Sequence, residues 1–310
     1  MLNGKTYYGE SGYLQMLATV LKHGVDVPDR TGVGSRAMVD AKIIFQPGEL
    51  PTGTSRPTPR KFALEEMKFF MGGHTQTKML EAKGIEFWKG NTTREFLDKR
   101  GLDYLDEGDF GEAYGFQWRG YNKNLVDAKH VVDQLDQTIS TLKKDPFSRR
   151  VYTTFWNPSA SSRMALTPCW HSHQFVVLPD SDGNLVVNLK MFSRSLDILF
   201  GYWAAVFQYK CFQLALIQLL NDTREPESPK YVEGALISDI TQHHIYSDQQ
   251  VYVEELLERP LGKLGTMRFE PNRKILTIDD LMGMEWSDFV TEGLEVNKTP
   301  FKTPRPEMAA

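Results

Sequence analysis

Hydrophobic residues recur at helical spacing in several segments of the chain. The spacing predicts helices near 11–21, over 62–71 and over 133–144. The second of these ends at Gly72-Gly73, a pair typical of a helix C-terminus. The segment 205–220 is apolar nearly all round. Such a segment is expected to form a helix that is buried on every side.

Other segments are short and rich in β-branched and aromatic residues, which is typical of strands. We expect strands at 36–45, 150–156, 174–178, 184–192, 232–241 and 274–278. The sequence Asp180-Ser181-Asp182-Gly183 between two of them predicts a hairpin turn. Helices and strands are mixed without strict alternation, which indicates an α+β fold. No linker forces a boundary, so one domain over 1–310 is expected.

Composition and charge exclude some classes of protein. The chain has 310 residues, of which 41% are hydrophobic, and its net charge is −4. A duplex-binding surface normally carries a basic excess, so we expect no nucleic-acid partner. The most apolar stretch, 200–220, is interrupted by Gln208, Lys210 and Gln213. It is therefore too polar for a membrane span, and no membrane partner is expected.

Cysteine usage and the first residues bear on the compartment. The two cysteines are far apart in the sequence and cannot form a disulfide framework, which favours a reducing compartment. The start, MLNGKTYYGES, contains no apolar segment of the kind found in signal peptides. We therefore expect a cytoplasmic protein, in the host cytoplasm if the source is viral.

The stretch TPCWHSHQF (167–175) places a cysteine beside two histidines. On a strand, Cys169, His171 and His173 would point to one face, and this would permit a metal site. A metal-dependent hydrolase is therefore one alternative, although no second ligand pair stands at a known spacing. Cys169 could also be a nucleophile or an inert thiol. Cys211, inside the apolar helix, fits an inert buried thiol.

Arginine and aromatic residues form further candidate features. Arginines stand in a glycine-containing turn (Arg30), after DPFS (149–150) and at a strand end (Arg194). Guanidinium groups match phosphate oxygens well, so these side chains could converge on one phosphate. Taken alone, they also fit solvated surfaces. The segment YGFQWR (114–119), taken alone, fits a core-lining aromatic strand or turn.

Several long motifs occur in a fixed order along the chain. They are DRTGVGS (29–35), FWKGNTTREFLDKRGL (87–102), GEAYGFQWRGY (111–121), DQL (133–135), DPFSRRVYTTFWNP (145–158), MALTPCW (164–170), SRSLD (193–197) and HIYS (244–247). This ordered set resembles thymidylate synthase and the related deoxypyrimidine-nucleotide hydroxymethylases, with a weaker similarity at the tail PRPEMAA. The resemblance implies a single large domain, a mixed sheet packed by helices, and a homodimer formed across the sheet.

The resemblance also implies roles for individual residues. Cys169 would add to C6 of a pyrimidine, after which C5 attacks the methylene group of 5,10-methylenetetrahydrofolate, the co-substrate. Arg194 would favour the thiolate. Glu66 would organise water and move protons, and Tyr114 would help the proton leave C5. Asp197 would act in catalysis and meet the folate pterin.

Binding roles follow from the same resemblance. The implied phosphate ligands are Arg30, Arg149, Arg150, Arg194 and Ser195. Arg149 and Arg150 would come from the partner subunit of the homodimer. The implied sugar ligands are His244 and Tyr246. The implied folate-binding residues are Trp88, Asp197, Gly201, Arg56 and the terminal Ala310, and the tail from about 296 to 310 would close over the folate.

The chain departs from the synthase pattern where the base is read. Trp170 stands where synthases have histidine, and Ala204 and Ala205 replace phenylalanine and the asparagine that pairs with uracil. Ala205 can read neither base, so Trp170 and His173 become candidates for base specificity. Gln242 and Lys89 also replace residues that are often aspartate in synthases.

The two alanines open volume near the polar edge of the base. Extra room for a water favours a hydroxymethyl product. We therefore expect a 5-hydroxymethylase of dUMP, dCMP or CMP. The alternative on the same scaffold is a thymidylate synthase, which methylates dUMP and releases dihydrofolate.

Overall fold

The computed structural model describes residues 5–29, 32–125 and 127–306. The strands in this part are β1 (Lys5–Tyr8), β2 (Val25–Val27), β3 (Ser35–Phe45), β4 (Tyr152–Thr154), β5 (Trp170–Pro179), β6 (Leu185–Asp197), β7 (Tyr231–Tyr246), β8 (Thr266–Phe269) and β9 (Phe289–Glu292). The α-helices are α1 (Gly9–His23), α2 (Arg60–Met71), α3 (Lys78–Glu81), α4 (Arg94–Lys99), α5 (Gly115–Arg119), α6 (Gln134–Lys144), α7 (Gly201–Thr223), α8 (Gln250–Glu258) and α9 (Ile278–Met282).

The central sheet is mixed. Its strand order is β1-β3-β7-β6-β5-β4, with β2 paired to β3. Strand β7 pairs antiparallel with β3 and parallel with β6, whereas β5 and β4 continue the sheet in antiparallel pairs. Buried and half-buried residues alternate along most of β6 and β7. The sheet therefore has one face in the core and one turned outward, and the expected α+β fold with a mixed sheet is confirmed.

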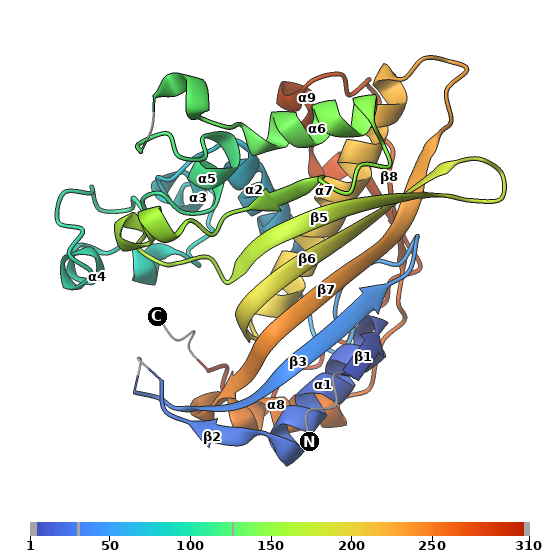
Figure 1. Ribbon diagram of the computed structural model, residues 1–310. Helices are drawn as coiled ribbons and strands as arrows, with labels where there is room; N and C mark the ends of the chain where they lie inside the picture. Colours follow the sequence, from blue (N-terminus) through green and yellow to red (C-terminus); the bar gives the residue numbers. More distant parts are fainter. Residues whose placement is uncertain (1–4, 30–31, 126, 307–310) are drawn as a thin grey trace.

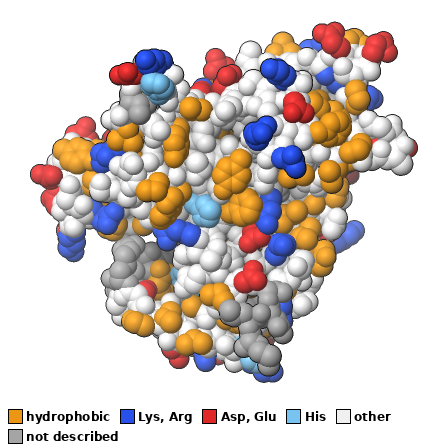
Figure 2. All heavy atoms as spheres, in the orientation of Figure 1, with side chains coloured by type: hydrophobic (Ala, Val, Ile, Leu, Met, Phe, Trp, Pro, Cys, Tyr) orange, Lys and Arg blue, Asp and Glu red, His pale blue; other side chains and the backbone are white. Residues whose placement is uncertain are grey.

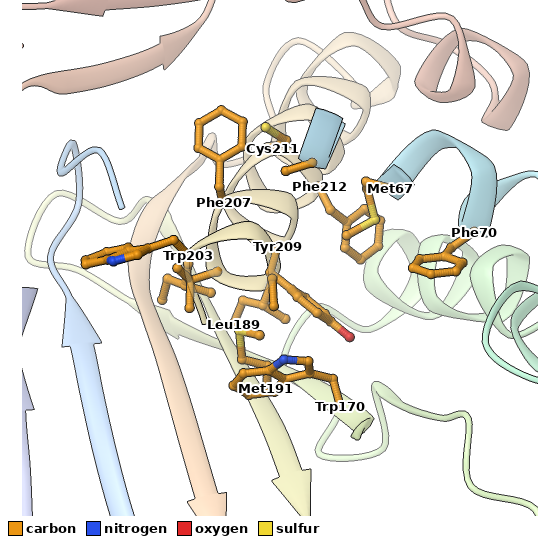
Figure 3. Packing of buried hydrophobic residues seen from close by; sticks show 14 of the residues in the cluster. Met67, Phe70, Trp170, Leu189, Met191, Trp203, Phe207, Tyr209, Cys211 and Phe212 are labelled. Atoms are coloured by element: carbon orange, nitrogen blue, oxygen red, sulfur yellow. The ribbon is translucent and has the colours of Figure 1, made fainter. Parts of the chain in front are cut away.

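Helix α7 lies against the inner face of the sheet (Figure 1). It contacts β6 and β7 on one side and α2 and α6 on others. Figure 3 shows Leu189 and Met191 of β6 on the sheet side of α7, while Phe212 of α7 points toward Met67 of α2. Contacts on several sides explain why the sequence of this helix is apolar nearly all round.

Three local predictions need correction. The strand predicted at 274–278 is wrong, because Thr277 accepts a hydrogen bond from the Asp280 backbone N–H and starts α9 at Ile278. The strand predicted at 150–156 is limited to β4. The segment after Tyr114 is the short helix α5, not a strand or turn. The predicted hairpin turn at 180–183 is confirmed between β5 and β6.

The outward face of the sheet is turned toward the viewer in Figures 1 and 2. We call it the open face and define it by Tyr152, Val176, Leu178 and Phe192. The first three of these side chains are 47%, 40% and 56% exposed. Within the ranges given above, no helix is drawn across this face in Figure 1. Among those same residues, no helix combines the length and the hydrophobicity that crossing a bilayer requires.

Candidate active site

A cavity of about 380 Å³ lies between the sheet and the helices α2, α5 and α7. Most of the predicted site residues line it, although they come from distant parts of the sequence. They are Arg56, Glu66, Trp88, Tyr114, Cys169, Trp170, Arg194, Ser195, Asp197, Gly201, Ala205, His244 and Tyr246. The structure therefore places the predicted chemistry, the predicted phosphate and sugar ligands and the predicted folate contacts around one space.

Cys169 lies in the loop that leads into β5. Its backbone N–H donates to the hydroxyl oxygen of Tyr114 at 3.0 Å, and a guanidinium nitrogen of Arg194 lies 3.9 Å from its Sγ. The backbone carbonyls of Thr167 and Pro168 accept from Arg194 at 2.9 and 3.0 Å and hold it in place. The thiol thus faces a fixed cation inside a cavity, an environment typical of a reactive cysteine.

Tyr114 precedes α5 and has a backbone φ of +38°. Residues other than glycine rarely adopt a positive φ. Its ring stacks on Phe70 at 4.9 Å, and its burial raises the pKa of the hydroxyl well above the ordinary value. The hydroxyl therefore stays neutral and can donate as well as accept a hydrogen bond. Strain of this kind collects at functional sites.

Glu66 reaches the cavity from α2. One carboxylate oxygen accepts from the indole N–H of Trp88 at 2.5 Å, and the other accepts from the amide N–H of Gln208. Burial raises the pKa of Glu66 to about 7, while the two hydrogen bonds act in the opposite direction. A carboxyl group with this pKa can take up and release a proton near neutral pH.

The C-terminal ends of β6 and β7 carry a set of polar side chains that contact one another. The amide oxygen of Gln242 accepts from the Ser195 hydroxyl at 2.8 Å and lies 3.2 Å from Nδ1 of His244. The ring of His244 lies edge-on to Tyr246, with centroids 5.0 Å apart. Burial lowers the pKa of His244 to about 4, so the imidazole is neutral at pH 7. Neutral donors and acceptors of this kind suit a sugar hydroxyl.

The cavity mouth is formed by the segment before α7 and by the C-terminal tail. Asp197 accepts from the backbone N–H groups of Leu199 and Phe200 and from the side chain of Gln249. Burial raises the pKa of Asp197, and these hydrogen bonds oppose the shift. Arg305 of the tail lies over the Phe200 ring at 5.2 Å and lines the cavity. The tail therefore reaches the mouth at Arg305.

Some predicted residues lie elsewhere. Arg149 and Arg150 are exposed and do not line the cavity of their own chain. Arg30 and Ala310 fall outside the described residues. His173 is a correction, because it is fully buried between the rings of Trp118 and Tyr209 and does not line the cavity. It is therefore not in a position to contact a base.

The metal alternative lacks its ligand arrangement. A register shift between Trp170 and Ser172 interrupts the strand just after Cys169, so regular alternation does not hold there. His171 is half-buried beside the Ser172 hydroxyl, whereas His173 lies among aromatic rings. In the part of the chain that the structure describes, no three His, Cys, Asp or Glu side chains form a group able to hold a metal ion.

The sequence prediction missed three cavity residues on α7, namely Trp203, Gln208 and Tyr209. Gln208 holds Glu66, and Tyr209 lines the same wall. Each lies four positions after one of the two alanines, so the helical repeat brings both into the cavity with them. The available signal was the presence of polar groups in an otherwise apolar helix, next to alanines already assigned to the site.

Comparison with known proteins agrees with the motifs and the fold. A family model described as thymidylate synthase matches residues 11–302. A thymidylate synthase of Agaricus bisporus is 31% identical over 92% of this chain and 95% of its own length. A probable thymidylate synthase of Schizosaccharomyces pombe is 32% identical over 92% of this chain and 45% of its own length. A bifunctional dihydrofolate reductase-thymidylate synthase of Leishmania major is 32% identical over 91% of this chain and 53% of its own length.

The chain spans about half the length of the last two relatives. The family model, in contrast, matches nearly the whole of this chain, and the Agaricus relative is matched over nearly the whole of both sequences. On the strength of these matches, the chain belongs to the thymidylate synthase family.

Proposed function

We propose that this protein transfers a one-carbon unit from 5,10-methylenetetrahydrofolate to C5 of a pyrimidine nucleoside 5′-monophosphate, with methylation of dUMP as the main reaction. The family assignment confirms the expected enzyme class, a one-carbon transferase of pyrimidine nucleotides that uses this folate as co-substrate. The observation that carries the proposal is the Cys169 thiol in the cavity, beside the Arg194 guanidinium and the Tyr114 hydroxyl.

The chemistry follows from this arrangement. The thiolate of Cys169 adds to C6 of the base, and the electron pair moves to C5, which attacks the methylene carbon of the co-substrate. The C5 proton then leaves to a water hydrogen-bonded to the neutral Tyr114 hydroxyl. The bond from the new carbon to the folate nitrogen breaks, and its electron pair stays on that nitrogen. Hydride from the tetrahydrofolate gives a methyl group and dihydrofolate, and the thiolate leaves C6. Glu66 supplies and accepts protons on the other side of the cavity.

Binding follows from charge and shape. Arg194, Ser195, His244 and Tyr246 line the cavity. The first two would bind the phosphate, and the last two would bind the sugar. Trp88 offers a flat surface to the folate ring, and Asp197 offers a carboxylate to its polar edge.

The site is proposed to be completed by a second copy of the chain. Arg149 and Arg150 are exposed outside their own cavity, and the carbonyl of Arg149 accepts from Gln174, next to the open face. The exposed apolar side chains of the open face support a dimer formed across the sheet (Figure 2). The two arginines would then reach the partner's cavity. The cytoplasmic location expected from the sequence stays a prediction.

The choice between methyl and hydroxymethyl products rests on two observations that point in different directions. The three relatives above are named thymidylate synthases, so the comparisons favour methylation, the expected alternative, over the hydroxymethylation expected first. Hydroxymethylation remains a second candidate, because Ala204 and Ala205 line the cavity with single methyl groups and leave room for water.

Product analysis tests the proposal. The protein is incubated with methylenetetrahydrofolate and with dUMP, dCMP or CMP carrying tritium at C5. Tritium release reports C5 proton loss, dihydrofolate formation reports hydride transfer, and mass spectrometry identifies the product. We expect tritium release, dihydrofolate and methylated nucleotide from dUMP, unchanged by a metal chelator. Absence of release from all three nucleotides would refute the proposal. Release without dihydrofolate, with a hydroxymethyl product, would establish the second candidate instead.

A further inference from the structure

The first turns of α7 form one wall of the cavity, and this wall combines small and large side chains. Gly201, Ala204 and Ala205 line it together with Trp203, followed one turn later by Gln208 and Tyr209. The amide N–H of Gln208 is bound to Glu66. No hydrogen bond within the described part of the chain involves the Tyr209 hydroxyl.

Tyr209 is 5% exposed, and its burial raises the pKa of the hydroxyl far above the ordinary value. The hydroxyl is therefore neutral, with one proton to donate and lone pairs to accept with. The side chain is mostly buried, but its hydroxyl oxygen retains surface at the cavity. A neutral hydroxyl in this position, with no hydrogen bond to a described residue, is available to a ligand.

Position on the helix explains why this hydroxyl is accessible. Side chains on a helix lean toward its N-terminus, so the Tyr209 ring extends over the turn that carries Ala205. The single methyl group of Ala205 does not cover it. The ring packs edge-on against His173, with centroids 5.5 Å apart and an interplanar angle of 72°. Figure 3 shows the side chain leaving α7 on the side of Trp170, with the hydroxyl pointing away from the helix.

The base orientation follows from the proposed function, on which this inference rests. If Cys169 bonds to C6, then N3 is directly across the pyrimidine ring and the 4-substituent lies beside it. Trp170 directly follows Cys169 and lines the cavity together with Tyr209. We propose that the Tyr209 hydroxyl binds the N3–C4 edge of the pyrimidine, and that this contact admits uracil and cytosine nucleotides with similar affinity.

The two bases present opposite patterns at this edge. Uracil offers an N3–H donor and an O4 acceptor, whereas cytosine offers an N3 acceptor and an amino donor. A hydroxyl group rotates about its C–O bond and can donate or accept, so it satisfies either pattern. Discrimination of many orders of magnitude arises when a polar group of the site is left unpaired by the wrong substrate. A rotating hydroxyl is not left unpaired by either base.

Equilibrium binding without folate tests this contact apart from turnover. Calorimetry measures the dissociation constants of dUMP, dCMP and 2-deoxyribose 5-phosphate for the wild-type protein, for Tyr209→Phe and for Tyr231→Phe. The last variant is the matched control. Tyr231 is also a buried tyrosine, but its hydroxyl donates to the Leu142 carbonyl, and it does not line the cavity.

We expect the wild-type protein to bind dUMP and dCMP within about 10-fold of each other. Tyr209→Phe should weaken both by about 3- to 10-fold, the range for one neutral hydrogen bond. It should leave 2-deoxyribose 5-phosphate unchanged, because that ligand has no base. Tyr231→Phe should change none of the three.

Other outcomes contradict either the proposed contact of Tyr209 or the proposed function on which it rests. Unchanged binding of both nucleotides in Tyr209→Phe would overturn the contact, and so would equal weakening of all three ligands, which indicates a structural role. Weakening for one base alone, or wild-type preference above about 100-fold, would overturn the claim of similar affinity. Failure of the wild-type protein to bind any nucleotide would remove the proposed function as well. Normal binding without turnover would remove the proposed function alone.

Discussion

The cavity has two walls that differ in how their polar groups are held. The chemistry wall consists of Cys169, Tyr114, Arg194 and Glu66, and every one of these has hydrogen-bonding partners within the protein. The α7 wall consists of the cavity-lining residues from Gly201 to Tyr209, of which three are small, and its last member has a hydroxyl that no described residue binds.

The difference separates reactivity from selectivity. Rate acceleration depends on groups that are already oriented before the reaction begins, and the chemistry wall meets this condition. Base selectivity depends on hydrogen-bond donors and acceptors in fixed positions, which are left unpaired by the polar edge of the wrong base. The α7 wall offers few such groups. The chain therefore combines a preorganised reaction centre with a permissive binding wall. The predictions below test the two walls in turn.

The largest effect is expected at the nucleophile. In Cys169→Ser the soft thiolate is lost, and a serine hydroxyl is not ionised in its place, so addition to C6 stops. Tritium release from C5 should fall by at least about 1,000-fold. Cys211→Ala is the control, since Cys211 is fully buried within α7 and burial raises its pKa well above the ordinary value. Comparable activity in Cys169→Ser and the wild-type protein would show that this wall has been assigned wrongly.

A smaller loss is expected at the carboxyl group of the same wall. Glu66→Gln keeps the shape but removes proton transfer, which should lower the rate by about 100-fold. In the wild-type protein burial raises the pKa of Glu66 to about 7. The pH–rate profile of the wild-type protein should therefore change slope near pH 7, and the profile of the variant should not.

Stability offers a second measurement on the same variant. Burial raises the pKa of Glu66 above its ordinary value of 4.5, so the folded state binds more protons than the unfolded state between pH 4.5 and about 7. The free energy of unfolding of the wild-type protein should therefore fall across this window as pH rises. Glu66→Gln has no ionisable carboxyl group at this position, so its free energy of unfolding does not fall for this reason. Its melting temperature relative to the wild type should be higher at pH 8 than at pH 5, and a pH-independent difference would contradict the shift.

The sequence named the residues of the chemistry wall and the small residues of the α7 wall, but not Gln208 or Tyr209. Cys169, Tyr114 and Arg194 stand in long motifs whose order identifies the family. Gln208 reaches Glu66 across 142 positions, a contact that local spacing does not reveal. The hydrophobic pattern of α7 is of little help either, since a helix apolar on nearly all sides does not show which side faces a cavity.

The errors in the fold have a similar origin. The prediction that Cys169, His171 and His173 share a face assumed regular alternation, and the register shift after Trp170 removes it. The strand predicted at 274–278 rested on a short run rich in β-branched residues, whereas the hydrogen bonds between Thr277 and Asp280 start a helix there. Patterns that extend over many residues, such as the alternation along β6, predicted the structure more reliably than patterns of a few residues.

A moderate effect is expected where the two walls meet. In Gln208→Met one N–H donor to the Glu66 carboxylate is lost, and because that bond favours the ionised form, the pKa of Glu66 should rise above about 7. The change of slope in the pH–rate profile should move to higher pH, with little change in the maximal rate. Gln218→Met on the same helix is the control, because Gln218 pairs with Asp222 away from the cavity. A change of slope that stays in place would show that Gln208 does not tune this carboxyl.

The smallest effect is expected at the mouth that closes over both walls. The tail is held by Glu255, which accepts from the backbone N–H groups of Lys302 and Thr303 at 2.7 Å, and this places Arg305 over Phe200 at the start of α7. An exposed contact between a cation and a ring contributes about 0.5–1 kcal/mol. Arg305→Ala should therefore raise the KM for the folate by about 2- to 5-fold and leave the binding of dUMP unchanged.

Lys298→Ala is the matched control for this variant, because Lys298 is an exposed cation in the same tail that does not line the cavity. Equal effects of the two variants would assign the change to the overall charge of the tail. An effect of Arg305→Ala on dUMP binding without folate would show that the tail contacts the nucleotide directly. The expected result, a folate-specific effect, would assign the contact of the tail at Arg305 and Phe200 to folate binding rather than to nucleotide binding.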